Sequence, residues 1–371
     1  MAKNEKKLEK KNLIITGIFI IAVFIIIFGG ALIYNKFFFN KSYSEVEAIM
    51  VEAAKEYLSK NEERLPQNIN NSITIPVSTL VKYDNMDEIN NYIKNNKVTC
   101  DGDVTVTNIN GDYRYGPMLD CGEAYQTKTL VDYIKENTSI VTSSNGLYEL
   151  NNELVYRGDK ADNYLKLNGK TYRIVKITDD GHLVVIFTDF PDKSVVWDNR
   201  YNIKTDSDSG INDFEVSRMR EYLANMYNNT SDEALLSESA KLLVTSYDLP
   251  IGARANGDTD KTGTLENAKV LTNQYIGLLP VSDFLNASID ENCTYTTSES
   301  CKNYNYLNKY KYTWWTITAS SKNTYKVYSI NRFASTTEAS NTAYIRPVLY
   351  LVNDTIYVSG NGSKDNPFII K

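Results

Sequence analysis

Four cysteines form two local pairs in this chain of 371 residues. Cys100 is followed by Cys121, and Cys293 is followed by Cys301. There is no Cys-x-x-Cys and the only histidine is His182, so the ligands of a structural zinc site are missing. Cysteines paired at such spacings are typical of disulfides in an oxidising compartment. We therefore predict the bonds Cys100–Cys121 and Cys293–Cys301.

One acidic segment has the spacing of a calcium-binding loop. Counted from Asp258, oxygen side chains stand at positions 1, 3, 5 and 9, with a glycine at 6 and an aliphatic residue at 8. Position 12, a bidentate glutamate in such loops, is Lys269. The alternative is a solvated acidic loop, and no other cofactor is predicted. The candidate calcium ligands are Asp258, Asp260, Thr262, Thr264 and Glu266.

Aromatic residues crowd the segment behind the second cysteine pair. Tyrosine and tryptophan present a flat apolar face with a polar tip, which suits them to stack on sugars or to seat a peptide. Neighbours on a strand point to opposite faces, so we expect one of Trp314 and Trp315 in the core and the other at a binding surface. The candidate binding residues are Tyr310, Tyr312, Trp314 and Trp315.

Motifs of enzymes are almost absent from the sequence. His182 follows an Asp180-Gly181 turn with no nucleophile motif beside it, so we predict a solvated turn residue rather than a catalytic base. No phosphate-binding loop, Ser-x-x-Lys or His-Glu-x-x-His occurs. No catalytic residue is therefore predicted. A pair of carboxylates acting as in glycosidases stays open, because one sequence does not reveal their separation.

The N-terminus has the pattern of a membrane anchor. Five lysines and two glutamates precede an uncharged apolar run at 13–34. At about 1.5 Å per residue such a helix crosses the roughly 30 Å hydrocarbon core, and it is longer than the core of a signal peptide. We predict that 13–34 is a single transmembrane helix in contact with lipid, with a cleaved signal ending near Gly29-Gly30-Ala31 as the alternative. The lysine-rich tail, 1–12, should stay in the cytoplasm, with the remaining chain outside the cell.

The part expected outside the cell is acidic. The net charge of the chain is −6, and removing the +3 tail leaves −9. Nucleic acid is excluded as a partner because binding phosphates needs a basic surface. The chain has 28 tyrosines and is rich in Asn, Ser and Thr, so its surface is polar without being highly charged. A glycan, a cell-wall component or a protein is the expected ligand.

A stalk helix and a small domain are predicted after the anchor, over 35–135. Ser42 and Glu45 fit a capping box, and apolar residues then recur on one helix face. Asn110-Gly111 between two alternating runs predicts a hairpin. The strands are expected at 73–77, 98–107 and 113–119, with a short helix near 86–94.

The region 13–135 resembles a pilin-like or pseudopilin-like subunit in its layout. An apolar helix continues as the amphipathic segment EAAKEYLSKN and leads into a small disulfide-closed sheet. Prepilins carry a glutamate soon after the processed glycine, but here Gly17 is followed by Ile18-Phe19-Ile20-Ile21-Ala22, with no glutamate. The resemblance therefore implies the architecture of a pilin, and a subunit of a pilus-like or secretion assembly is an alternative function.

A polar linker is predicted at 136–146, followed by an extracellular domain at 147–371. Short runs of β-branched and aromatic residues between turns indicate a mostly antiparallel sheet, and thus an α+β fold. One helix is expected at 214–226, capped by Asn212 or Asp213. The strands are expected at 153–157, 164–167, 172–178, 182–188, 313–318, 325–330, 344–351 and 355–358.

Six segments of this domain resemble an uncharacterised family of bacterial extracellular domains. They are LNGKTYRIVKI, SRMREYL, IGLLPVSDF, WWTITAS, IRPVLYL and SGNGSKDNPFII, in this order between Leu167 and Ile370. The Trp-Trp strand followed by Arg-Pro-Val-Leu is also similar to the core of the C-type-lectin and formylglycine-generating-enzyme fold. That likeness implies a mixed sheet with long loops, and neither likeness brings an activity.

A noncatalytic surface protein is predicted from four features together: the anchor, the stalk, the acidic ectodomain and the lack of catalytic motifs. We expect it to bind or adhere to a ligand outside the cell, or to serve a structural role there. A pilus-like subunit and a carboxylate-dependent extracellular hydrolase are the alternatives.

Overall fold

The computed structural model describes residues 41–371, apart from 94–97, 190–192, 231–233 and 309–310. The predicted anchor at 13–34 lies outside these residues. Within the described part of the chain, no helix is both long and apolar enough to cross a membrane. The described residues form two compact units: one ends at 108 and includes 115–127, and the other comprises 109–114 and 128–371.

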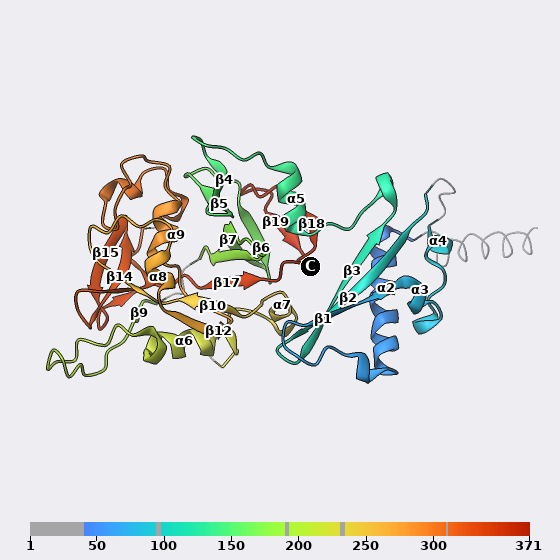
Figure 1. The fold of residues 1–371 in the computed structure, drawn as a ribbon, viewed down its shortest axis with the longest axis horizontal. Coiled ribbons are helices and arrows are strands. Elements are labelled where there is room, and N and C mark those ends of the chain that lie inside the picture. Colours follow the sequence, from blue (N-terminus) through green and yellow to red (C-terminus); the bar gives the residue numbers. More distant parts are fainter. Residues whose placement is uncertain (1–40, 94–97, 190–192, 231–233, 309–310) are drawn as a thin grey trace, which may run out of the picture. The chain divides into compact units, whose positions relative to one another are not determined.

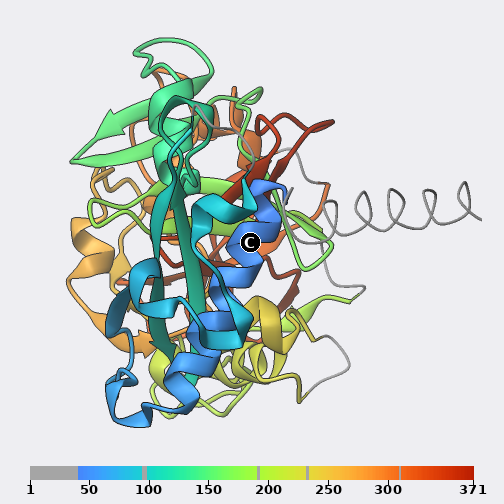
Figure 2. The ribbon, with the colours of Figure 1, turned by 90° about the vertical axis from the view of Figure 1, so that its right-hand side faces the viewer.

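The first unit is a helix packed on a small antiparallel sheet. Helix α2 (Tyr43–Ser59) begins at Ser42, where the predicted capping box with Glu45 is formed in both directions. Its buried side chains, such as Met50, lie against the sheet in the order β1-β2-β3 (Figures 1 and 2). The other elements are η1 (Glu62–Arg64), β1 (Ser72–Pro76), α3 (Val77–Leu80), η2 (Tyr83–Asn85), α4 (Ile89–Tyr92), β2 (Asp101–Ile109), β3 (Asp112–Asp120) and η3 (Gly122–Ala124).

The predicted hairpin joins β2 and β3. Asn110 and Gly111 both have positive φ, 54° and 96°, as a tight two-residue hairpin turn requires. The disulfide between Cys100 and Cys121 closes the other end of the hairpin, with the two sulfurs 1.99 Å apart. The pairing predicted from the local spacing is confirmed.

The second unit begins with helix α5 (Leu130–Asn137), which is capped by Thr129. The side chains of Leu130 and Ile134 are fully buried in the core of this unit. The segment expected as a linker, 136–146, starts inside this helix and ends at the first residue of β4, so both of its ends lie in regular structure.

Eight strands form the largest sheet of the second unit (Figure 1). Its path is β17-β8-β7-β6-β19-β18, and the β4–β5 hairpin attaches through β5 to β7. Among the strand pairs of this sheet that the structure describes, β6 and β19 are parallel and the others are antiparallel. The strands are β4 (Gly146–Leu150), β5 (Glu153–Arg157), β6 (Tyr164–Leu167), β7 (Lys170–Ile177), β8 (Leu183–Phe187), β17 (Val348–Leu351), β18 (Tyr357–Ser359) and β19 (Phe368–Ile370).

Three smaller sheets complete the strand structure of this unit. A four-stranded sheet has the order β11-β13-β14-β15, and two-stranded sheets join β10 to β12 and β9 to β16. The strands are β9 (Val195–Val196), β10 (Tyr247–Pro250), β11 (Ala253–Arg254), β12 (Val270–Gln274), β13 (Trp314–Ser320), β14 (Lys326–Asn331), β15 (Phe333–Glu338) and β16 (Thr342–Ala343).

The remaining helices of the second unit are short. The helix predicted at 214–226 is divided, because Asp213 caps a first turn and Ser217 caps a new helix. The helices are η4 (Phe214–Val216), α6 (Arg218–Tyr227), α7 (Glu238–Lys241), α8 (Thr264–Asn267), α9 (Val281–Asn286), η5 (Glu299–Lys302) and η6 (Tyr306–Asn308). The predicted α+β class, rich in sheet and with two disulfides, is confirmed.

Candidate functional site

Both tryptophans proposed for ligand binding are buried. Trp314 is 1% exposed and Trp315 is 0% exposed. The indole N–H of Trp315 donates to the carbonyl of Val195 at 2.9 Å, and Trp314 packs edge-on against Phe284. Strand β13 is thus covered on both faces, although a strand with one exposed face was expected. The prediction that one of the two indoles lines a surface was wrong.

The predicted tyrosines do not complete an aromatic surface. Tyr312 is 44% exposed, and its ring lies against Tyr344 with centroids 4.6 Å apart. Tyr310 lies outside the described residues. Of the four predicted binding residues, Tyr312 is therefore the one that is both described and exposed.

The acidic loop closes around an arginine. Arg254, fully buried, places Nη2 3.0 Å from Oδ1 of Asp258 and Nη1 3.2 Å from Oε1 of Glu266. Glu266 Oε1 also accepts from the backbone N–H of Ser282 at 3.2 Å, at the start of α9. Asp258 and Glu266, which were predicted as calcium ligands, are thus bound by the guanidinium of Arg254.

The other predicted calcium ligands bond within the loop. Asp260 accepts from the backbone N–H groups of Thr262 and Leu265, at 2.8 and 3.1 Å. Burial alone would raise the pKa of Asp260, but a hydrogen bond from the Thr262 hydroxyl, together with these two backbone bonds, outweighs it and lowers that pKa. The hydroxyls of Thr262 and Thr264 lie 2.7 Å apart. In the described part of the chain, no three His, Cys, Asp or Glu residues are grouped as ligands of a metal ion.

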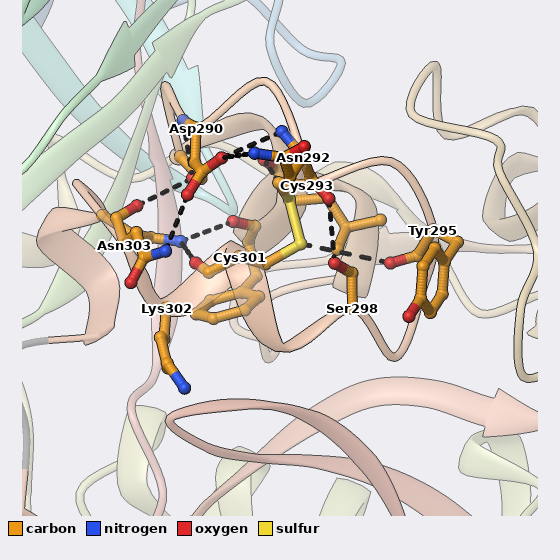
Figure 3. The surroundings of a disulfide bond; sticks show 12 residues. Asp290, Asn292, Cys293, Tyr295, Ser298, Cys301, Lys302 and Asn303 are labelled. Atoms are coloured by element: carbon orange, nitrogen blue, oxygen red, sulfur yellow. Dashed lines mark hydrogen bonds between the residues drawn. A yellow bond between two sulfur atoms is a disulfide. The ribbon is translucent and has the colours of Figure 1, made fainter.

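The second predicted disulfide is formed by Cys293 and Cys301, with sulfurs 2.00 Å apart (Figure 3). Both cysteines are buried, and polar residues brace the loop between them. Asp290 accepts from the side chain of Asn303 at 2.6 Å, and the Ser298 hydroxyl donates to the carbonyl of Asn292 at 3.0 Å. These hydrogen bonds tie together the loop and the two segments that flank it.

A pocket of about 280 Å³ lies in the second unit, where β5, β7, β10 and α9 meet. Its lining is dominated by polar and charged side chains, whereas small-molecule pockets are mostly apolar. The ionisable residues of the lining are Glu153, Lys176, Asp179, Asp248, Glu266, Asp283 and Tyr350.

Lys176 is the one cation that lines this pocket. Its ammonium nitrogen lies 2.9 Å from Oε2 of Glu153 and 3.5 Å from Oδ1 of Asp283. The ladder between β7 and β8 shifts register between Ile174 and Lys176, which marks a β-bulge. Bulges change the direction of the side chains that follow them, and this one precedes the pocket lysine.

The charges of the pocket perturb one another. Burial raises the pKa of Glu153, even though Lys176 lowers it. Burial alone would lower the pKa of Lys176, but Asp283, Tyr350 and Glu153 outweigh it and raise that pKa above its ordinary value. At neutral pH the side chain of Lys176 is therefore positively charged.

Three polar side chains of the pocket are available to a ligand. Asn151, Asp248 and Asn267 are exposed, and their side chains form no hydrogen bond or ion pair with any residue that the structure describes. Amide and carboxylate groups together offer both donors and acceptors. The pocket can thus receive a ligand rich in hydroxyl or amino groups.

Comparison of the chain with protein-family models, curated proteins and solved structures returns no match. The function must therefore be inferred from the polar pocket.

Of the residues that line this pocket, the sequence singled out only Thr262 and Glu266, and it assigned them to calcium. Glu153, Lys176 and Asp283 come from three separate segments, and no spacing links them. A signal was available in Lys176, which lies with Arg173 inside the predicted strand 172–178, because burying a charge requires a partner. His182, predicted as a solvated turn residue, does follow the turn, but its side chain is only 24% exposed and its Nδ1 lies 3.0 Å from the carbonyl oxygen of Leu351.

Proposed function

We propose that this chain is a membrane-anchored surface protein whose second unit binds a polar ligand, such as a glycan or a cell-wall fragment, outside the cell. The observation that carries this proposal is the polar pocket between β5, β7, β10 and α9. Its volume of about 280 Å³ suits one sugar ring or the end of a short peptide, at the small end of the range of ligand pockets.

The lining of the pocket supports a hydroxylated or amine-bearing ligand. Five carboxylates and one lysine line it, so an anionic ligand would meet repulsion. Asn151, Asp248 and Asn267 have free polar groups to exchange bound water for the hydroxyls of a ligand.

Placement outside the cell rests on the sequence and on the disulfides. The apolar run at 13–34 with its lysine-rich tail is the proposed anchor. Both cysteine pairs are joined, which is the expected state of surface proteins and unusual in the cytosol. The similarity to bacterial extracellular domains drawn from the sequence agrees with this placement.

A binding array tests the proposal. The purified full-length chain is applied to arrayed glycans and cell-wall fragments, together with the variants Asp248→Asn and Asp365→Asn. Asp248 lines the pocket, whereas Asp365 is exposed elsewhere, so the pair matches the change in charge. Binding that Asp248→Asn alone weakens supports the pocket, and equal binding by both variants contradicts it. Release of reducing sugar from a bound glycan would instead favour the hydrolase.

A subunit of a pilus-like or secretion assembly is the second candidate. It is favoured by the packing of α2 along the three-stranded sheet of the first unit, closed by Cys100 and Cys121. Cross-linking in native membranes tests it, because an assembly yields a ladder of multimers and a lone receptor yields a monomer.

A further inference from the structure

The lysine of the pocket has the surroundings of a reacting group. Lys176 on β7 meets Glu153 on β5 and Asp283 on α9, with Nζ 2.9 and 3.5 Å from their carboxylate oxygens. The three side chains are 16%, 28% and 8% exposed, in that order. These are the components needed to form an amide: the amine of Lys176, the carboxyl group of Asp283 beside it, and the carboxyl group of Glu153, which can carry protons.

A second cluster of one lysine, one aspartate and one glutamate lies at the solvent-exposed surface of this chain. Lys269 bridges Asp213 and Glu215 at 3.0 and 3.3 Å, but its side chain is 47% exposed. Water solvates those charges and competes for the carbonyl carbon, so that cluster is an ordinary surface ion pair. The two clusters differ mainly in burial, which makes Lys269 an internal control.

We propose that Lys176 and Asp283 become joined by an amide bond between Nζ and Cγ, and that Glu153 catalyses the reaction. This modification is independent of the ligand proposed above. It removes one positive and one negative charge, so the net charge of the pocket lining stays the same.

The reaction balances without any co-reactant. Nζ of Lys176 passes a proton to Glu153, and the neutral amine attacks Cγ of Asp283 to form the C–N bond. Glu153 returns the proton to one oxygen of the tetrahedral intermediate, and a second proton follows from the nitrogen by the same route. The C–O bond breaks, one water molecule leaves, and Glu153 ends as the carboxylate with which it began.

Position and burial make the condensation feasible. Well-oriented groups within one molecule reach effective concentrations on the order of 10⁵ M, which would offset the excess of water that favours hydrolysis. The ammonium is the resting form of Lys176, so the step is slow, but each chain needs to react only once. Burial, which favours the protonated form of Glu153, helps it to accept the proton.

The bond would fix helix α9 to the large sheet. Lys176 belongs to β7, which pairs with β5, β6 and β8, whereas Asp283 lies in the first turn of α9. Residues far apart in sequence would be cross-linked, as by a disulfide, but reducing agents would not open the link.

Intact mass of the reduced full-length chain tests the proposal. We expect a mass lower than that of the sequence by one water molecule, and a digest with the peptides of Lys176 and Asp283 joined. The full mass, with both peptides recovered separately, would overturn the proposal.

Variants distinguish this amide bond from other reactions that also remove one water molecule. A succinimide at Asp180-Gly181 also lowers the mass by one water, but it does not need a lysine. Lys176→Arg should therefore restore the full mass, whereas Lys269→Arg should leave the loss in place. A loss that survives Lys176→Arg contradicts the amide, and unchanged cross-linking in Glu153→Gln contradicts the role of Glu153.

Discussion

Arg254 and Glu266 form an ion pair in the interior of the second unit, with Nη1 3.2 Å from Oε1 and at most 1% of either side chain exposed. Glu266 in turn accepts from the backbone of Ser282 at the start of α9. The pair therefore links the acidic loop to the helix that carries Asp283, and it supports one wall of the pocket.

Removing the cation of this pair should destabilise the protein. Arg254→Met leaves Glu266 buried without its counter-charge, which costs about 3–5 kcal/mol in comparable pairs. The free energy of unfolding, from denaturant titration, measures the loss. Arg332→Met, at an exposed position, is the control and should have little effect. Equal stability of both variants would show that Arg254 is not the partner of Glu266.

Calcium should leave the melting temperature of the protein unchanged. The guanidinium of Arg254 already forms ion pairs with both Asp258 and Glu266, and a divalent cation would have to displace it. Melting in millimolar calcium and in chelator checks this expectation. A rise with calcium that Asp260→Ala abolishes would instead establish the loop as a calcium site.

Alkaline pH should weaken the first unit through Tyr125. Its hydroxyl donates to the buried Glu47 at 2.8 Å, and burial together with this bond raises the pKa of Tyr125 to about 12. A raised pKa means that its contribution to stability is complete below about pH 10, the ordinary value, and is lost as the pH rises through about 12. Tyr125→Phe should therefore flatten the decline of unfolding free energy in that range. The exposed Tyr304→Phe is the control, and an identical slope in all three proteins would contradict the assignment.

The two disulfides should contribute unequally to stability. They close loops of sequence separation 21 and 8, and the entropy of the unfolded chain gives about 3.4 and 2.6 kcal/mol. Replacing Cys100 and Cys121 by serine should thus cost more than replacing Cys293 and Cys301. Denaturant unfolding of the two double variants compares them directly, and the reverse order would mean that native contacts dominate over chain entropy.

Local features of the fold could be predicted from the sequence. The capping box of Ser42 and Glu45, the Asn110-Gly111 turn and both cysteine pairs depend on residues close together in the chain. Such signals act within one helix turn, one hairpin or one loop, so the sequence contains all of their partners.

Features that depend on distant segments could not be predicted. Alternation along β13 placed one of Trp314 and Trp315 at a surface, but elements elsewhere in the chain cover both faces of that strand. The spacing of Asp258 and Glu266 suggested a metal, and the cation is Arg254, which precedes the loop. Lys176 likewise acquires its partners only when β5, β7 and α9 come together.

Affinity of the double variant Asp248→Asn/Asn267→Ala for the strongest ligand on the array tests the central claim most directly. Both side chains are exposed in the pocket and have no partner among the described residues, so their loss should not disturb folding. Two lost hydrogen bonds at about 1 kcal/mol each predict a Kd at least tenfold higher than that of the unchanged protein. Asp365→Asn should bind as the unchanged protein does. A double variant of unaltered affinity would contradict the pocket as the binding site.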